Sequence, residues 1–262
     1  MTHGPQPAPV TIASRDNPLI KQLRRLSEQG TAYRRTGQFW IEGEHLCSAA
    51  VARGMRPAVL VVAASRMNQV PGAWQAAAAR TVVLEDRLFA DLSALESPSH
   101  VGFVIDLPTP PAQPLQVASV VLDRVQDAGN VGSILRSAAA FGFRQVLALQ
   151  GTAGLWSAKV LRAGMGAHFG LQLIEGLQAD DVRATGLPLL VTSSHQGQDL
   201  QQEDPPWPCA WVFGHEGQGV SALLLEAAAR RVRIPQPGGE ESLNVAAAAA
   251  ICLFASARAG TR

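Results

Sequence analysis

The stretch IPQPGGEESLNVAAAAAICLFASAR, residues 234–258, organises the C-terminal half of this chain. It reads as the end of a strand, a loop rich in proline and glycine, and an alanine-rich helix. Ser242 is a good N-cap residue for that helix, and the apolar positions recur at helical spacing: Leu243, Ala247, Ala250 and Phe254. Because almost nothing polar lies on any face before Arg258, we expect the helix to be buried.

The polar residues at the start of this helix indicate a ligand site. Backbone N–H groups in the first turn of a helix have no partner within the helix, so they are available to a ligand. Glu241, Ser242 and Asn244 stand where those N–H groups meet the apolar body of the helix. An ordinary loop that leads into a helix has the same pattern, so this stretch alone leaves both interpretations open.

Composition is typical of a packed intracellular protein. The chain has 262 residues, enough for two ordinary domains or one large one, and with 47% hydrophobic and 16% charged residues it can bury a proper core. The cysteines are odd in number and widely spaced, which indicates neither a disulfide framework nor a zinc site: Cys47, Cys209 and Cys252. No targeting segment is evident and the terminal helix is too short to cross a bilayer, so we expect a soluble, cytoplasmic protein without a membrane partner.

The charge is balanced overall but concentrated in one segment. The net charge of +1 argues against a simple nucleic-acid coat protein. Between residues 15 and 35, however, six cations stand against two acids, and these cations are candidates for binding RNA: Arg15, Lys21, Arg24, Arg25, Arg34 and Arg35. A solvated helix face has the same pattern, so the charge alone does not decide between the two.

The first hundred residues predict a small α/β domain. Residues 1–10 are expected to be a mobile tail. Strands expected at residues 39–41, 57–65, 81–86 and 100–107 alternate with helices expected at 17–29 and 44–53, and we assign residues 11–106 to an N-terminal substrate-binding domain. Residues 107–115, LPTPPAQPL, contain four prolines in nine and are expected to form a semi-rigid linker.

The remaining residues, 116–262, predict a second α/β domain. Strands are expected at residues 117–123, 145–149, 188–194, 210–214 and 231–234, with helices at 133–141, 158–163 and 221–229 before the terminal helix. This order predicts a mainly parallel sheet with helices on both faces. In such sheets ligands bind beyond the carboxyl ends of the strands, so the polar loops at those ends are the candidate site.

Three loops supply the polar residues. The first, DAGNVGSILR (127–136), offers Asn130 as a helix cap and Arg136 on the helix it opens. The second, FGHEGQGVS (213–221), has glycines that permit close approach of a ligand, but their order is not the GxGxxG dinucleotide fingerprint, and Gly219 replaces the second histidine of an HExxH zinc site. The third is the loop before the terminal helix. A Rossmann dehydrogenase and a metal site are therefore disfavoured.

Taken together, the loops resemble the SpoU/TrmH family, the RNA ribose 2'-O-methyltransferases of the SPOUT superfamily. The resemblance rests on an asparagine and an arginine six apart after the first strand, G-x-E-G-x-G after a later one, and I-P-x-x-G followed by S-L-N-V-A at the last helix. It covers nearly the whole region after the linker. The N-terminal domain is similar to that family's substrate-binding module in SRDNPLIKQLRRL (14–26) and FWIEGEHL (39–46).

The resemblance implies a deep trefoil knot in the C-terminal domain and a homodimer formed through that domain. It also implies a structured RNA as substrate, and by analogy we favour 23S rRNA over tRNA. It implies S-adenosylmethionine as cofactor, held by backbone groups at Gly214, Ile234 and Leu243 and covered by the loop of residues 214–219. The further cofactor-binding candidates are Glu216, Gly217, Gly219, Gln236 and Asn244.

The resemblance also implies catalytic roles without a metal. Arg136 lies nearest the 2'-hydroxyl proton, and since a guanidinium is effectively never deprotonated, we assign it as a clamp on phosphate and developing alkoxide. Asn130, Ser242 and Asn244 are expected to orient the ribose, and Glu216 to pair with Arg136. The chain departs from the family at Gln236 and Pro237, where an apolar residue is common, and at Glu240 and Glu241, which we expect to face solvent.

Another class of function fits part of the pattern. A non-catalytic RNA-binding or ribosome-assembly protein could keep the fold, but it predicts loss of Asn130, Arg136 or Asn244, and all three are present. A tRNA methyltransferase is the alternative within the same chemistry.

Overall fold

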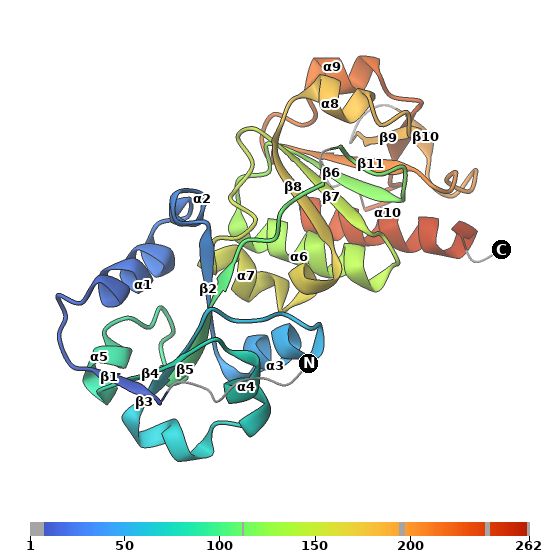
Figure 1. Cartoon of the computed structure of the whole chain (residues 1–262). Coiled ribbons are helices and arrows are strands. Elements are labelled where there is room, and N and C mark those ends of the chain that lie inside the picture. Colours follow the sequence, from blue (N-terminus) through green and yellow to red (C-terminus); the bar gives the residue numbers. More distant parts are fainter. Residues whose placement is uncertain (1–7, 112, 194–196, 239–241, 261–262) are drawn as a thin grey trace. The chain divides into compact units, whose positions relative to one another are not determined.

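The computed structural model describes residues 8–111, 113–193, 197–238 and 242–260, and the chain forms two compact units. The N-terminal unit comprises Met1–Pro108 and Trp156–Phe169, and the C-terminal unit comprises Thr109–Leu155 and Gly170–Arg262. Figure 1 shows the elements of both. Each unit is described by itself below.

The N-terminal unit is built on a five-stranded sheet of order β1-β4-β3-β5-β2. Strands β1, β4 and β3 run parallel, and β5 is antiparallel to both β3 and β2. Its strands are β1 (Val10–Ile12), β2 (Gln38–Glu42), β3 (Val59–Ala63), β4 (Thr81–Leu84) and β5 (Val101–Asp106). Its helices are α1 (Pro18–Glu28), α2 (Ala32–Thr36), α3 (Glu44–Ala52), the 3-10 helix η1 (Ala64–Gln69), α4 (Gly72–Ala77), α5 (Asp86–Ala90) and α7 (Ala158–Gly164).

Two features of this unit differ from the sequence predictions. Val10, assigned to a mobile tail, begins β1 and pairs with Val82 of β4; residues 1–7 of that tail lie outside the described part of the chain. Residues 156–169, assigned to the second domain, belong to this unit. The reason is apolar packing, since Trp156 lies 4.6 Å from Phe39 between ring centroids and α7 packs against α1 and β2.

The C-terminal unit is built on a seven-stranded sheet of order β10-β12-β9-β11-β6-β7-β8, in which every pair is parallel. Its strands are β6 (Ser119–Asp123), β7 (Gln145–Leu149), β8 (Gln172–Leu177), β9 (Leu189–Thr192), β10 (Gln198–Asp199), β11 (Ala210–Gly214) and β12 (Arg230–Arg233). Its helices are α6 (Ala128–Ala140), α8 (Ala179–Arg183), α9 (Ala222–Glu226) and α10 (Val245–Gly260), and the short 3-10 helix η2 (Ala167–Gly170) lies at the boundary of the two units.

Helices cover both faces of this sheet, as predicted (Figure 1). Strand side chains alternate between the faces. Val121 and Val212 pack with Val182 of α8 and Leu224 of α9 on one face. The opposite face meets α6 and α10, and the indole N–H of buried Trp211 in β11 donates to Ser256 Oγ of α10 at 2.7 Å.

The terminal helix is not buried on every side, which contradicts the expectation from its composition. Ala249, Cys252 and Leu253 face the interior, but Ile251 is 41% and Phe254 53% exposed. The residue pattern of α10 is apolar all round, and only one side of it is covered within the chain.

The first helix after β6 also begins earlier than predicted. It starts at Ala128 rather than Ser133, because Asp127 caps it: its Oδ1 accepts from the N–H of Asn130 at 2.7 Å. The helix ends before Gly142, whose φ of +82° is the left-handed conformation expected after a helix C-terminus.

Candidate active site

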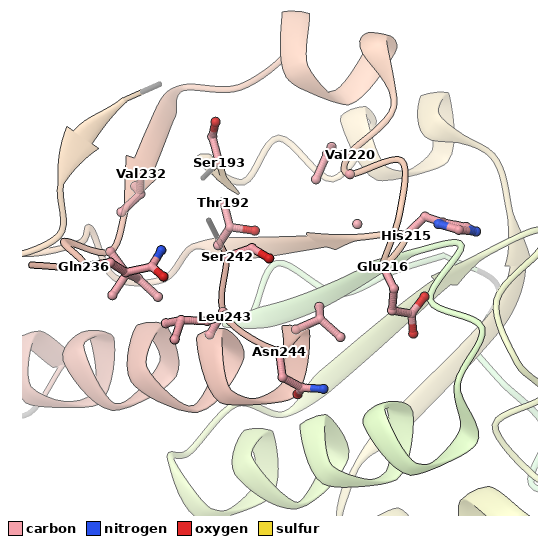
Figure 2. Close-up of a pocket in the computed structure, with 15 residues that line it drawn as sticks. Thr192, Ser193, His215, Glu216, Val220, Val232, Gln236, Ser242, Leu243 and Asn244 are labelled. Atoms are coloured by element: carbon pink, nitrogen blue, oxygen red, sulfur yellow. The ribbon is translucent and has the colours of Figure 1, made fainter. Parts of the chain in front are cut away.

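A pocket of about 320 Å³ opens at the carboxyl ends of three neighbouring strands, β9, β11 and β12, beside the start of α10. Figure 2 shows the pocket in close-up, with its lining residues as sticks. This is where parallel α/β sheets place their ligands. It is lined by Thr192, Ser193, Gly214, His215, Glu216, Gly219, Val220, Val232, Ile234, Gln236, Ser242, Leu243, Asn244, Val245 and Ala248.

Asn244 begins the terminal helix and joins it to the first loop. Its Oδ1 accepts from the N–H groups of Ala246 at 2.9 Å and Ala247 at 3.3 Å, so Asn244, and not Ser242, is the N-cap residue. Because Oδ1 is fixed by these donors, the amide nitrogen must point the other way, and it donates to Asn130 Oδ1 at 2.9 Å. Ser242 lines the pocket instead.

Asn130 is not the cap of α6 either. It lies in the first turn of the helix that Asp127 caps, which leaves its side chain available to bridge two loops. Its Oδ1 accepts from Asn244, and its Nδ2 donates to Glu216 Oε1 at 3.2 Å. One amide thus connects all three predicted loops.

Glu216 completes the connection between the loops. Its carboxylate accepts from the N–H of Asp127 at 3.1 Å and of Gln126 at 3.2 Å, besides Asn130. Partial burial opposes the charge, but hydrogen bonds from backbone N–H groups of Glu216 itself, Asp127 and Gln126 and from the Asn130 amide outweigh it and lower the pKa of Glu216.

The predicted pairing of Glu216 with Arg136 is wrong, because the carboxylate is committed to these amides. Arg136 lies on α6 with its side chain exposed, and it has no hydrogen-bond or ion-pair partner among the residues that the structure describes. Its planar fork of donors is therefore available to a ligand from outside the chain.

His215 fixes the conformation of the loop of residues 214–221, the glycine loop, although the sequence did not assign this residue to the site. His215 Nδ1 accepts from the N–H groups of Gly217 at 2.9 Å and Gln218 at 3.2 Å, so this nitrogen carries no proton. Gly214 has to be glycine, because a Cβ there would lie 2.3 Å from the backbone of Gly219. The sequence signal for His215 was its place in the loop directly after a buried strand.

Most of the predicted site residues meet at the pocket. Gly214, Glu216, Gly219, Ile234, Gln236, Ser242, Leu243 and Asn244 line it, whereas Gly217, Asn130 and Arg136 are not among its lining residues. Thr192 and Ser193 line it too and were missed, although polar residues at the end of a buried strand are the signal that could have found them. Gln236 Oε1 is buried and has no partner among the described residues. Glu240 and Glu241 lie outside the described part of the chain.

The predicted RNA-binding cations all lie in the N-terminal unit, and several already have partners. Arg15 pairs with Asp91, Lys21 with Asp16 at 3.0 Å, Arg35 with Gln29 at 3.0 Å, and Arg34 donates to the Tyr33 hydroxyl at 3.3 Å. Arg24 and Arg25 lie on α1 without a partner among the described residues, Arg25 exposed and Arg24 partly so.

Two classes of site are not found in the described ranges. No group of three or more His, Cys, Asp or Glu side chains there could hold a metal ion. Nor does that part of the chain contain a helix with the length and apolar character needed to cross a membrane.

Comparison with known proteins agrees with this geometry. Residues 118–254 match the SpoU rRNA Methylase family, and residues 17–102 match the MRM3-like substrate binding domain. The 23S rRNA (guanosine(2553)-2'-O)-methyltransferase RlmP of Bacillus subtilis is 32% identical over 249 residues, which are 93% of this chain and 97% of the relative.

Solved structures agree over the same length. A TrmH-family RNA methyltransferase from Porphyromonas gingivalis, described as putative, has a TM-score of 0.79 at 33% identity and covers 91% of this chain and 96% of its own. An S-adenosylmethionine-bound rRNA methyltransferase from Sinorhizobium meliloti has a TM-score of 0.82 at 27% identity, covering 95% and 97%. The resemblance found in the loops is thereby confirmed: the chain belongs to the SpoU rRNA Methylase family.

Proposed function

We propose that this protein transfers a methyl group from S-adenosylmethionine to a ribose 2'-hydroxyl of 23S rRNA. The observation that carries the proposal is the hydrogen-bonded path Asn244–Asn130–Glu216, which joins the three loops at one pocket. The substrate follows the Bacillus subtilis relative, which is named as acting on 23S rRNA. We also place its action in the cytoplasm, where the ribosomes of Bacillus subtilis, the source of that relative, are assembled.

The pocket has the features that a cofactor of this kind requires. Gly214 lets the backbone of Gly219 and Val220 pack directly against the end of β11, which brings the glycine loop to the edge of the pocket. Leu243 and Val232 give apolar contacts, while Gln236 Oε1 is a buried acceptor that lacks a donor. We assign cofactor binding to Gly214, Gly219, Ile234, Gln236 and Leu243, with Gly217 in the covering loop. Bound there, S-adenosylmethionine supplies an electrophilic methyl group.

The chain's own residues then have to place and polarise the ribose hydroxyl. The guanidinium of Arg136 is a planar fork of donors without an acceptor, so it holds phosphate or developing alkoxide and does not take the proton. Asn130, Asn244 and Glu216 position the loops rather than pairing with Arg136. Ser242, exposed beside Asn244 at the pocket, is placed to orient the ribose.

Two further properties of the family are part of the proposal. The exposed apolar side of α10 supports a homodimer through the C-terminal unit. A trefoil knot is supported by the position of α10, which packs on α6 and β11 near the middle of the sheet although it follows β12 near the edge.

The test is a map of ribose methylation in total RNA from cells with and without the gene. One 23S rRNA nucleotide is expected to lose its 2'-O-methyl group in the deletion strain and to regain it with the wild-type gene. A lost tRNA methylation would instead assign tRNA as substrate. An unchanged map, together with no methyl transfer from labelled cofactor to rRNA or tRNA in vitro, would favour a non-catalytic RNA-binding protein.

A further inference from the structure

The corner after β6 holds a buried carboxylate that connects two loops. Asp123, the last residue of β6, is only 1% exposed. Its Oδ2 accepts from the N–H of Ser221 at 2.6 Å, and its Oδ1 accepts from Nε of Arg124 at 2.9 Å. Both oxygens of a buried carboxylate are thus satisfied, one by the far end of the glycine loop and one by the neighbouring arginine.

Arg124 extends this connection into the glycine loop itself. Its Nη1 donates to Gln218 Oε1 at 2.9 Å and its Nη2 to the carbonyl oxygen of Gly219 at 3.3 Å. A guanidinium has donors in a fixed fork, so Arg124 can serve Asp123 and both loop residues at once. Gly219 lines the pocket, whereas Arg124 does not, so Arg124 contacts the glycine loop from outside the pocket.

The backbone conformation of Arg124 sets the direction of its side chain towards the glycine loop. Its φ of +63° is the left-handed conformation, which is uncommon for residues other than glycine. The Arg124 N–H donates to Thr152 Oγ1 at 3.1 Å, and that hydroxyl donates to the Leu122 carbonyl at 2.9 Å. A Cβ at Gly151 would lie 3.2 Å from Arg124 Cγ, so the side chain lies against this glycine.

We propose that Arg124 is a positioning residue that holds the loop of residues 214–221 against the pocket and sets how long the cofactor stays bound. The loop is held on two sides. On one side, the Glu216 carboxylate accepts from the N–H groups of Gln126 and Asp127 and from the Asn130 side chain. On the other side, Arg124 donates to Gln218 and Gly219. Releasing the second side lets the loop open more often, which raises the dissociation rate. This inference rests on the proposed function, because it takes the pocket to be the cofactor site.

Three variants of the full chain test the proposal by their affinity for S-adenosylmethionine and S-adenosylhomocysteine. Arg124→Ala removes every side-chain hydrogen bond of the arginine and is expected to weaken binding about tenfold, the scale of one hydrogen bond to a charged group. Gln218→Ala leaves the Asp123–Arg124 pair intact and should cost about threefold. Arg124→Lys, with a single point charge, should fall between wild type and Arg124→Ala.

The kinetic pattern separates positioning from general damage. Arg124→Ala should raise KM for the cofactor and its dissociation rate, with kcat at saturating cofactor and RNA within about twofold of wild type. The matched control is Arg183→Ala, which removes an exposed arginine paired with Asp180 in α8 and should bind the cofactor as wild type does.

Amide hydrogen exchange in the cofactor-free protein gives a readout that does not need cofactor binding. The N–H groups of Gly219 and Ser221, which donate to His215 O and Asp123, should exchange faster in Arg124→Ala, while those of the central strands do not change. If the wild type binds neither cofactor nor its product, the proposed function fails, and exchange still decides whether Arg124 holds the loop.

Two outcomes overturn the proposal. In the first, Arg124→Ala has wild-type affinity, dissociation rate and exchange at Gly219 and Ser221. In the second, kcat falls as much as affinity and exchange rises throughout the sheet, which would make Arg124 a general structural residue. If Arg124→Ala fails to fold, Gln218→Ala decides whether Arg124 holds the loop, because this variant keeps the buried Asp123 carboxylate paired with Arg124. Wild-type affinity and exchange in Gln218→Ala would then overturn the proposal.

Discussion

Substitution of Arg136 is the most direct test of the proposed chemistry. Its side chain extends from α6 without a partner among the described residues, and it does not line the pocket. Arg136→Ala is expected to lower kcat by about a hundredfold or more, as removal of one donor to a developing oxyanion does, with cofactor affinity unchanged. Single-turnover methyl transfer and cofactor titration measure the two effects separately.

Arg136→Lys distinguishes the roles of the arginine. We expect it to recover only part of the loss, because a lysine ammonium cannot make two parallel hydrogen bonds to phosphate. Near-normal turnover in the lysine variant would contradict the clamp and would reopen a role in proton transfer. Arg183→Ala again serves as the control for the loss of one positive charge in the same unit.

The sequence predicted which residues lie at the pocket more accurately than it predicted their individual roles. Ser242 and Asn130 were expected as helix caps, but Asn244 and Asp127 cap instead. All four residues are of types that make good N-caps, so propensity could not choose among them. Propensity also does not show tertiary contacts: the Asn244 side chain caps α10 and also donates to Asn130, 114 positions away.

At the scale of elements, the glycine loop after β11 should depend on pH through Glu216. The pKa of this carboxyl is lowered in the folded protein, so its contribution to stability is fully present above its unfolded value, near 4.5, and is lost as pH falls through the lower folded value. Glu216→Gln removes the charge and replaces one of the two carboxylate oxygens with an NH2 donor, which then faces the N–H group of either Gln126 or Asp127.

Urea midpoints of the wild type and Glu216→Gln, measured from pH 7 to pH 3, check this. The wild type should be more stable by about 1 kcal/mol at neutral pH, a modest value because the side chain is largely exposed to solvent, and the difference should shrink as the pH falls below 4.5. A difference that stays constant over this range would show that the carboxylate's charge is not what holds the loop.

The elements themselves were largely predictable where apolar runs are long. The predicted strands of the C-terminal sheet correspond to β6, β7, β9, β11 and β12. β10 was missed because it has two residues, and β8 because it carries Glu175 and Gly176 where its register shifts. The unit to which α7 belongs could not be predicted, since an apolar helix face does not specify which sheet it covers.

At the scale of the whole molecule, the three cysteines agree with the expectation that they form no disulfide framework. All three thiols are free and buried, and burial raises the pKa of each, that of Cys209 to about 12. They therefore serve as apolar packing groups. The terminal helix is the place where composition and packing disagree: its residues are apolar all round, yet Ala247, Ile251 and Phe254 face outwards.

The proposed homodimer would cover these side chains with a second copy of the chain, and this gives the last prediction. Phe254 packs edge-on against Phe141 of the same chain, with ring centroids 5.6 Å apart, so the exposed apolar side of α10 is continuous with the end of α6. Fully burying a Phe or an Ile contributes about 1.5–3 kcal/mol for each side chain; Phe254 and Ile251 are already about half buried, so covering the rest contributes about half of that value, and twofold symmetry counts each side chain twice. The wild type should therefore sediment as a dimer at micromolar concentration.

The double variant Ile251→Glu/Phe254→Glu should sediment as a folded monomer, with the dimer dissociation constant raised by at least about a hundredfold, because its carboxylates would be buried without partners. The matched control is Leu223→Glu on α9, where Leu223 is 56% exposed on the other face of the sheet. This control should remain dimeric. A monomeric wild type would contradict the proposed dimer, and a double variant that still dimerises would place the interface elsewhere on the chain.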